Sequence, residues 1–381
     1  MKTRTLFLAS LALVSTLNSQ LSTAFAQGSL TPPDAPAPTM KSLDQIEPRT
    51  PISSLPFAIT SAGSYYLTTN LTLDIINTSG IVISADDVVV DLNGFALRGP
   101  GSGAGGTAAG ILGSGPRHNL AIRNGVVRNW GGTGIELFDA GSNCQMERIF
   151  AYGNGGYGIA SGGGSVVRDC TSEANASQGI RVANGSTVRG CTARLNGGFG
   201  FRLINDCVLQ SSVSSSNTSH GVPTGANCTI KDCSVANNKG YGIVAGKVCT
   251  IKDCTVAANG TIPAAVMAGI QADSRSTISG CTVSDSVWYG ILVTDHCLVV
   301  GNNVSLSLQS GIYTAGTHNR IDGNTVTFNT KGIEVVGTLN AITRNSASDN
   351  SGNNYPIVGG NQVGPSGVPA SATSPWANIS F

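Results

Sequence analysis

The dipeptide Gly-Ile, or a close variant of it, returns along most of this 381-residue chain at a nearly constant interval. The usual step is 21 residues, with steps of 30, 24 and 24 residues at the start of the series and one of 27 residues later. Self-similarity at this period predicts a stack of small supersecondary units, not a compact globule. The copies start at Gly80, Gly110, Gly134, Gly158, Gly179, Gly200, Gly221, Gly242, Gly269, Gly290, Gly311 and Gly332.

Each unit contains short segments in which apolar β-branched residues alternate with polar ones, punctuated by Gly, Asn or Asp. This period of two is typical of strands, and no helical period occurs in the array. Such short segments cannot bury a face alone, but coils stacked about 4.8 Å apart close a continuous core. We therefore expect an all-β parallel β-helix (solenoid) of about 12 coils with about 21 residues each.

Aligning the coils places like residues in columns that run along the stack. Two columns are expected to point inward and a third to lie at a turn, where stacked amides can hydrogen-bond to one another. One extra residue after Gly311 shifts the last members of each column by one. The inward columns are Cys207, Cys228, Cys249, Ser276, Cys297, Asn319, Asn340 and Cys170, Cys191, Ser212, Cys233, Cys254, Cys281, Asn302, Asn324, Asn345; the turn column is Asn154, Asn175, Asn196, Asn217, Asn238, Asn259, Ser286, Ser307, Asn329, Asn350.

The chain has ten cysteines, and a chain that is exported can form disulfides. Residues stacked in register lie about 4.8 Å apart with parallel side chains, whereas a disulfide needs Cβ atoms about 3.5–4.5 Å apart. In the columns, cysteine also interchanges with serine and asparagine, as a small buried residue would. We expect stacks of buried thiols, and disulfides are the alternative.

The first 26 residues have the pattern of a secretory signal peptide. Lys2 and Arg4 precede an apolar run, and Ala24-Phe25-Ala26 matches the small-x-small cleavage pattern. Cleavage after Ala26 predicts a secreted or periplasmic protein, and no later segment reaches the length of a membrane span. We expect a Pro-rich linker or N-terminal cap over 27–57, the solenoid over 58–360 and a C-terminal capping tail over 361–381.

Charge is sparse and balanced in this chain. Charged residues make up 11% of it, and the formal net charge is +1. Binding to nucleic acid or to an anionic membrane needs a basic field, which this composition does not supply. We therefore expect neither partner, and the sequence does not indicate an oligomeric state.

The units resemble the repeats of right-handed parallel β-helix proteins of the pectin-lyase-like superfamily. Residues 58–360 carry the resemblance, and the segments that start at Ser64 (Ser-Tyr-Tyr-Leu) and Ala85 (Ala-Asp-Asp-Val-Val-Val-Asp-Leu-Asn-Gly) resemble a first-coil signature of secreted bacterial members. The resemblance implies a right-handed coil. It leaves the activity open, because that superfamily includes polysaccharide lyases, glycosidases, uronate epimerases and phage tailspikes.

The catalytic patterns that this resemblance would lead one to seek are mostly missing. A polygalacturonase-like site needs an Asp pair with further motifs on adjoining coils, and Asp86-Asp87, the only Asp pair, stands without them. Inverting hydrolysis needs two facing carboxylates about 6.5–9.5 Å apart, whereas Asp86 and Asp87 are expected to cap a turn. A pectate-lyase-like calcium cluster is not evident either, although Ca²⁺ stays possible because the acidic residues are thinly spread and not absent.

One group of ionisable residues falls at the same turn of consecutive coils. It consists of Asp273, Arg275, Asp295, His296 and His318, with His318 stacked over His296. An imidazole near carboxylates and a guanidinium can remove the proton next to a uronate carboxylate while the arginine neutralises charge. Two alternatives remain: a divalent metal held by the histidines and an Asp, and a turn that is simply solvated.

Aromatic residues recur beside the repeated Gly, on one long face of the expected solenoid. They are Tyr157, Phe199, Tyr241, Trp288, Tyr289 and Tyr313, interleaved with Arg181, Arg202, Gln271 and Glu334. Rings stack on the faces of pyranose sugars, and polar groups fix the hydroxyls, so this face predicts a sugar-binding track. The alternative is a ladder of rings that only pack over the turn.

These features predict an exported β-helix that binds an extended polysaccharide on its outer face, with lyase- or epimerase-type activity on uronate sugars left open. If the protein is an enzyme, a glycosidase is a further class. The alternative is a non-catalytic structural or cell-surface protein whose repeat serves only its architecture.

Overall fold

The computed structural model describes residues 48–103, 105–139, 141–261 and 267–381. The compact unit considered below starts at Arg49. The predicted signal peptide over 1–26, and all of the predicted linker except residues 48–57, lie outside the described residues.

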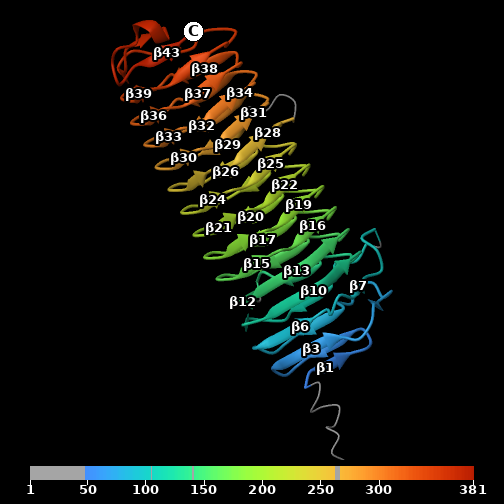
Figure 1. Ribbon diagram of the computed structural model, residues 1–381. Coiled ribbons are helices and arrows are strands. Elements are labelled where there is room, and N and C mark those ends of the chain that lie inside the picture. The colour runs from blue at the N-terminus through green and yellow to red at the C-terminus, as the bar shows by residue number, and fades with distance from the viewer. Residues whose placement is uncertain (1–47, 104, 140, 262–266) are drawn as a thin grey trace, which may run out of the picture. The chain divides into compact units, whose positions relative to one another are not determined.

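One face of the solenoid is built from the strands that follow the repeated Gly, which we call the Gly-Ile strands (Figure 1). Seven of them form one parallel sheet and six form another. A bridge between Leu203 and Thr224 links the two sheets. The first seven are β2(Phe57–Ile59), β5(Ile81–Ile83), β8(Ile111–Gly113), β11(Ile135–Leu137), β14(Ile159–Ser161), β17(Ile180–Val182) and β20(Phe201–Leu203); the next six are β23(Val222–Pro223), β26(Ile243–Ala245), β29(Ala268–Ala272), β32(Tyr289–Val293), β35(Ser310–Thr314) and β38(Lys331–Val335).

The rest of each coil belongs to one 28-stranded parallel sheet, to which most coils add two short strands. The first of these two, with the long strands that span both positions, are β1(Thr50–Ile52), β3(Gly63–Leu67), β6(Val88–Asp91), β10(Ala121–Arg128), β13(Gln145–Tyr152), β15(Val166–Arg168), β18(Thr187–Arg189), β21(Val208–Gln210), β24(Thr229–Lys231), β27(Thr250–Lys252), β30(Thr277–Ser279), β33(Leu298–Val300), β36(Arg320–Asp322), β39(Ala341–Thr343) and β41(Gln362–Val363). The second are β4(Leu71–Thr72), β7(Ala96–Arg98), β16(Thr171–Glu173), β19(Thr192–Arg194), β22(Val213–Ser215), β25(Ser234–Ala236), β28(Thr255–Ala257), β31(Thr282–Ser284), β34(Asn303–Ser305), β37(Thr325–Thr327), β40(Ser346–Ser348), β42(Ser366–Gly367) and β43(Asn378–Ser380). A small sheet of β9(Arg117–His118) and β12(Gly141–Ser142) and one 3₁₀ turn, Pro369–Ser371, complete the described elements.

The predicted all-β parallel solenoid and its 21-residue step are confirmed. Cys233 and Cys254 lie on adjacent rungs, because Ser234 pairs with Thr255 in the next coil. The predicted 12 coils are too few, since the structure has about 14 turns. The extra rungs are β2, which follows Pro56 instead of Gly, and the bridge between Val335 and Ile357. Both lack the Gly-Ile pair from which the coils were counted.

Steric contact explains why glycine recurs in front of the Gly-Ile strands. A Cβ atom at Gly221 would lie 2.5 Å from Cγ1 of Val235 and 2.6 Å from the carbonyl oxygen of Gly242. Neither neighbour is free to move, because one is a core side chain and the other is backbone of the next coil. The absence of a side chain is therefore a packing requirement of the coil.

Each coil bends at residues in the left-handed conformation. In the coil of β26, β27 and β28 these are Val248, Asp253 and Ala258, with φ of 61°, 52° and 52°. Asn, Asp and Gly accept this conformation at low cost and fill many equivalent positions, whereas large side chains do so at a cost. Leu306 and Phe328 adopt it nonetheless, each with φ of 57° and with half or more of the side chain exposed.

The three predicted columns are present as stacked residues, and hydrogen bonds join parts of each one. The turn column is interrupted at Ser286 and Ser307, whose Oγ atoms have no hydrogen-bond partner among the described residues. In the turn column, Nδ2 of Asn217 donates to Oδ1 of Asn238 at 2.8 Å, and Nδ2 of Asn196 donates to Oδ1 of Asn217 at 3.0 Å. Each Oδ1 also accepts the backbone N–H of the previous rung. The ladders therefore satisfy amides that would be costly to bury alone.

All ten cysteines are free and buried, as predicted. Their thiols take the role that asparagine has elsewhere in the same column. The Sγ of Cys254 contacts the carbonyl oxygens of Lys252 and Ile230, and Nδ2 of Asn324 donates to those of Asp322 and Val299. Cysteine and asparagine interchange because both donate to the carbonyl two residues earlier and to one in the preceding coil.

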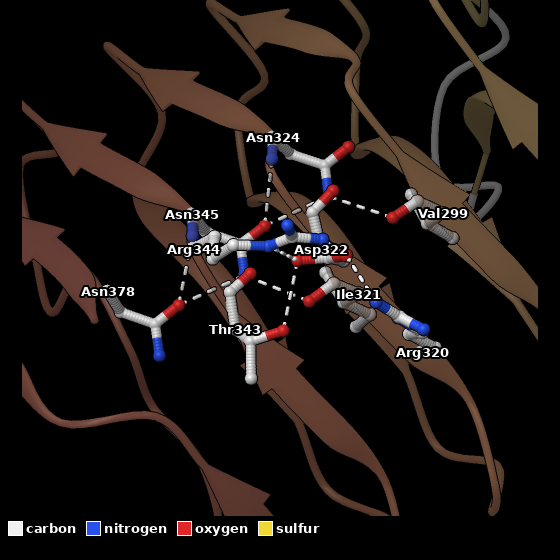
Figure 2. Close-up of polar contacts among 9 residues, drawn as sticks. All are labelled: Val299, Arg320, Ile321, Asp322, Asn324, Thr343, Arg344, Asn345 and Asn378. Carbon is white, nitrogen blue, oxygen red and sulfur yellow. Dashed lines mark hydrogen bonds and ion pairs between the residues drawn. The ribbon is translucent and has the colours of Figure 1, made fainter. Parts of the chain in front are cut away.

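The C-terminal segment supplies the last rung of the ladder. Figure 2 shows Asn324, Asn345 and Asn378 in line, and Nδ2 of Asn345 donates to Oδ1 of Asn378 at 3.1 Å. Beside them the buried carboxylate of Asp322 accepts from Arg320 and Arg344, and Arg344 also faces the Trp376 ring. Residues after 360 thus pair in register with the coils, and strands also precede residue 58, so the rungs extend beyond 58–360 at both ends.

Candidate functional site

The outward side chains of the Gly-Ile strands form a single column along one face. Strand register places each of them next to its equivalent in the following coil. A second column holds the residues just before each repeated Gly, which precede the members of the first column by three positions in the same coil. We call the surface made by these two columns the outer face; the first column contains Glu136, Ala160, Arg181, Arg202, Pro223, Val244, Gln271, Leu292, Tyr313 and Glu334, and the second contains Tyr157, Gln178, Phe199, His220, Tyr241, Ala268, Tyr289, Ser310 and Lys331.

Three consecutive coils stack aromatic rings on this face. The rings of Phe199 and His220 are parallel, with centroids 5.3 Å apart and planes 11° apart. Tyr241 continues the stack with its edge toward His220, at 5.3 Å. All three residues are half-buried, and the contacts between neighbouring coils cover part of each ring.

The imidazole of His220 is held in one tautomer. Its Nδ1 accepts the backbone N–H of Tyr241 at 3.1 Å, which leaves the ring proton on Nε2. Gly240 makes room for this contact, because a Cβ atom there would lie 2.3 Å from Nδ1. Burial, and next the positive charge of Arg202, lower the pKa of His220 below its usual value. The ring is therefore neutral near pH 7 and keeps an Nε2–H donor.

Arg181 lies between two aromatic residues of earlier coils. Its guanidinium carbon is 3.6 Å from the centroid of Phe138 and 5.4 Å from that of Tyr157. Its Nη1 donates to the Tyr157 hydroxyl at 3.2 Å. In the next coil Arg202 lies over Phe199 at 5.9 Å. Cation–π contact orients these guanidinium groups without neutralising their charge.

Glu136 lies on the same face, two coils before Arg181. Burial raises the pKa of its carboxyl, and the nearby charge of Asp139 acts in the same direction. The backbone N–H of Phe138 donates to Oε1 at 3.1 Å and opposes that shift. A half-buried carboxyl with a raised pKa that interacts with the charge of a guanidinium, here Arg181, is the kind of group that carries protons in active sites.

A second aromatic group lies further along the same face. Tyr289 and Tyr313 stack with centroids 4.4 Å apart and planes 14° apart, and Trp288 lies 6.5 Å from Tyr289. Burial, followed by the neighbouring Tyr313 and Glu334, raises the pKa of Tyr289. Tyr313 borders an open hollow of about 310 Å³ whose lining also includes Leu292, Asp295 and Gly316. The hollow brings together one residue from each of the two predicted groups, the sugar track and the ionisable turn.

At the predicted ionisable turn, the stacking of the histidines is confirmed. The rings of His296 and His318 are 4.8 Å apart with planes 11° apart, and both side chains are exposed. The two carboxylates mainly bind the turn itself. Oδ1 of Asp273 accepts from Ser274 N at 2.7 Å, and Oδ1 of Asp295 accepts from Thr317 N at 2.7 Å. No hydrogen bond or ion pair joins Asp273, Arg275 or Asp295 to either imidazole within the described residues.

Metal coordination needs several ligand atoms that converge on one point. Across the residues that the structure describes, no group of three or more His, Cys, Asp or Glu side chains is arranged to hold an ion. The rings of His296 and His318 are parallel and stacked face to face, so their nitrogen atoms do not point toward a common metal position. This arrangement differs from the oxygen-rich shell that Ca²⁺ prefers.

The prediction from the sequence did not single out some of the residues that the structure places at this site. Phe138, and with it the neighbouring Glu136, lies near Arg181 only because the arginine side chain extends back across two coils to the Phe138 ring. His220 stands in the aromatic column, where its position before Gly221 was the available signal. Five of the six predicted aromatic residues belong to the outer face, and Trp288 adjoins one of them, Tyr289. They form two groups, with Tyr157, Phe199 and Tyr241 apart from Trp288, Tyr289 and Tyr313.

Comparison with known families agrees with this architecture. The model of the right handed beta helix region matches residues 58–218 and 216–365. The chain belongs to this family. The match confirms the predicted right-handed coil and its likeness to pectin-lyase-like proteins. A comparison with curated proteins gives no match to this chain.

Solved structures of similar fold include two enzymes and a phage protein. The A-module of the mannuronan C-5 epimerase AlgE4 of Azotobacter vinelandii is 17% identical, with a TM-score of 0.53 over 71% of this chain and 84% of that chain. The A-module of AlgE6 from the same organism is 15% identical, with a TM-score of 0.50 over 78% and 88%. A tailspike protein of E. coli bacteriophage HK620 is 12% identical, with a TM-score of 0.52 over 84% and 72%. At these identities the similarity concerns the fold.

No helix within residues 48–381, the undescribed gaps aside, has the length and hydropathy that crossing a bilayer requires.

Proposed function

We propose that this protein binds an extended polysaccharide along its outer face. The observation that carries the proposal is the stack of half-buried rings on three consecutive coils, Phe199, His220 and Tyr241, with Arg202 over Phe199. Tyr157 beside Arg181 lies two coils earlier, and the Tyr289–Tyr313 stack lies further along the same face. The exposed parts of such rings offer apolar contact area at little entropic cost. Coils repeat about every 4.8 Å, so the track offers equivalent contacts to successive sugars of a linear chain.

The epimerases of similar fold act on mannuronan, which makes uronate sugars the first substrates to test. Lyase or epimerase chemistry on this face would use Glu136 or the turn of Asp273, Arg275, Asp295, His296 and His318. Glu136 has the stronger support, because its carboxyl is half-buried, has a raised pKa and interacts with the charge of Arg181. The turn has weaker support, since its carboxylates are engaged by backbone N–H groups. Export is part of the proposal and rests on the pattern of residues 1–26.

The test is a glycan array with the purified mature chain, followed by titration of the best ligand. Phe199→Ala and Tyr313→Ala remove rings from the two aromatic groups, and Leu195→Ala, an exposed apolar side chain at another corner, is the matched control. Each ring removal is expected to weaken binding about tenfold, the usual effect of losing one stacking contact. No binding to any glycan, or equal affinity of the ring variants and the control, would contradict the proposal.

Catalysis is tested separately. Lyase activity on uronate polymers creates an unsaturated product that absorbs near 235 nm, and epimerase activity changes the proton NMR spectrum of the polymer without shortening it. Both assays are run with calcium and with a chelator. Glu136→Gln is expected to abolish any activity while the polymer still binds, and activity that survives this change would move the chemistry elsewhere.

A purely architectural protein is the second candidate. It is favoured by the way Asp273 accepts a backbone N–H of its own turn and Asp295 accepts one from the turn of the next coil, and by the mutual stacking of Tyr289 and Tyr313. In that case Phe199→Ala and Tyr313→Ala lower the stability of the protein and no glycan affinity is lost, because none exists. Thermal unfolding of the same variants therefore separates the two candidates.

A further inference from the structure

Arg181 and Arg202 form a pair of like charges on the outer face. They are directly opposite each other in register, on β17 and β20. Like charges in register on neighbouring strands are destabilising. Such pairs also occur in the 28-stranded sheet, and in two of them, Arg168–Arg189 and Lys231–Lys252, one member, Arg168 or Lys252, has a carboxylate partner. Within the described residues neither Arg181 nor Arg202 has an ion pair.

Both guanidinium groups are nonetheless fixed in place. Arg181 is held against Phe138 and by the Tyr157 hydroxyl, and Arg202 is held over Phe199. A guanidinium has five N–H donors, of which Arg181 uses one here and Arg202 none within the described residues. Two pre-oriented cations with most of their donors unused match the needs of an oxyanion, which arginine binds in a bidentate manner.

His220 adds a third donor beside this pair. Its Nδ1 accepts the N–H of Tyr241, so its proton lies on Nε2. Its ring stacks on Phe199, over which the guanidinium of Arg202 also lies. The ring contributes a hydrogen bond without adding a third positive charge. Gly240 allows this position, since any side chain there would collide with the ring.

We propose that Arg181, Arg202 and the Nε2–H of His220 form a subsite for an anionic substituent, either a carboxylate or a sulfate ester, of the bound polysaccharide. This inference rests on the proposed function and names the charge class of the ligand. Glu136 acts on Arg181 through its charge but forms no ion pair with it within the described residues, so the bound anion would supply a direct counter-charge to both arginines. The anion would also make affinity fall with ionic strength, because salt screens contacts between charges that stay partly exposed to solvent.

The test compares three polymers: polygalacturonate, which carries carboxylates, heparin, which carries mainly sulfate groups, and uncharged dextran. Arg181→Gln and Arg202→Gln remove one charge each, and His220→Phe keeps the ring while removing the donor. Arg189→Gln is the matched control, because Arg189 lies in the same coil as Arg181 but on β18, at an exposed position. Affinity is measured by calorimetry at two salt concentrations.

Each arginine variant is expected to lose about tenfold or more in affinity for one of the acidic polymers, and to lose most of the salt dependence, while the control keeps both. His220→Phe is expected to lose less. The polymer that shows this dependence identifies the carboxylate or the sulfate as the ligand. If the acidic polymers bind and the arginine variants behave like the control, the subsite is refuted while the sugar track stands. If Phe199→Ala and Tyr313→Ala also leave binding unchanged, or nothing binds, the proposed function fails as well.

Discussion

Replacing one buried amide of the ladder tests whether the polar columns stabilise this fold. Asn302 and Asn303 are neighbours in sequence, but Asn302 is 2% exposed within a column and Asn303 points outward from β34. Asn302→Ala and Asn303→Ala therefore make the same chemical change at adjacent positions in two environments.

The expected magnitude follows from the contacts of Asn302. Its Oδ1 accepts the backbone N–H of Cys281 at 2.9 Å, and its Nδ2 donates to Ile278 O at 3.1 Å and to Oδ1 of Asn324 at 2.9 Å. Removing the amide leaves the Cys281 N–H buried without an acceptor, which costs about 1–3 kcal/mol, and loses two further bonds of about 0.5–1.5 kcal/mol each. We expect Asn302→Ala to destabilise by about 2–6 kcal/mol and Asn303→Ala by less than about 0.5 kcal/mol.

Urea unfolding followed by far-ultraviolet circular dichroism gives both free energies. Asn302→Cys is an informative third variant, because Cys281 occupies the preceding rung of the same column and donates to a carbonyl two residues back. It is expected to fall between the wild type and Asn302→Ala. Equal stability of Asn302→Ala and Asn303→Ala would refute the view that the amide column contributes to stability.

Three other outcomes follow from the structure. Hydrogen bonds from Arg344 hold the pKa of Asp322 at about 2, below its unfolded value of 3.8, so the stability that this carboxylate contributes is complete above pH 4 and is lost as the pH falls toward 2. Asp322→Asn should therefore lower the Tm at pH 7, and the difference in Tm from the wild type should shrink toward pH 2. A difference in Tm that is independent of pH would contradict this. The ten buried thiols should resist an aromatic disulfide reagent in the folded protein and all react in guanidinium, whereas fewer than ten reactive thiols would show disulfides. Phe328→Asn should stabilise by about 1 kcal/mol in urea, since an exposed Phe with φ of 57° costs more than Asn there, and a loss of stability would mean that the ring has a packing role.

The columns were predictable because a coil repeats its environment at a fixed step. Once the Gly-Ile pairs set that step, Cys207, Cys228 and Cys249 had to stack, and hydrogen bonding and burial show that they do. The rungs that lack the pair could not be found in this way. The rung of Asn378 is the clearest case, because it follows Asn345 after 33 residues instead of 21.

The candidate site was predictable only in part. The outward positions of Arg181 and Arg202 follow from alternation along a strand, but the reach of Arg181 to Phe138 depends on side-chain conformation across 43 residues of sequence. The Asp273 and Asp295 positions were read correctly as neighbours at a turn. The hydrogen bonds of the two carboxylates could not be predicted from the sequence, because those bonds depend on which backbone N–H groups the turn leaves without an acceptor.

The last rung also indicates how this architecture can acquire new parts. Between Asn345 and Asn378 the chain makes a detour of twelve residues beyond the usual step and still returns in register. A detour at a corner leaves the stacked rungs unchanged, since the entropic cost of closing a longer loop grows only slowly with its length. Corners are therefore positions where whole segments can be inserted or exchanged while the scaffold keeps its spacing.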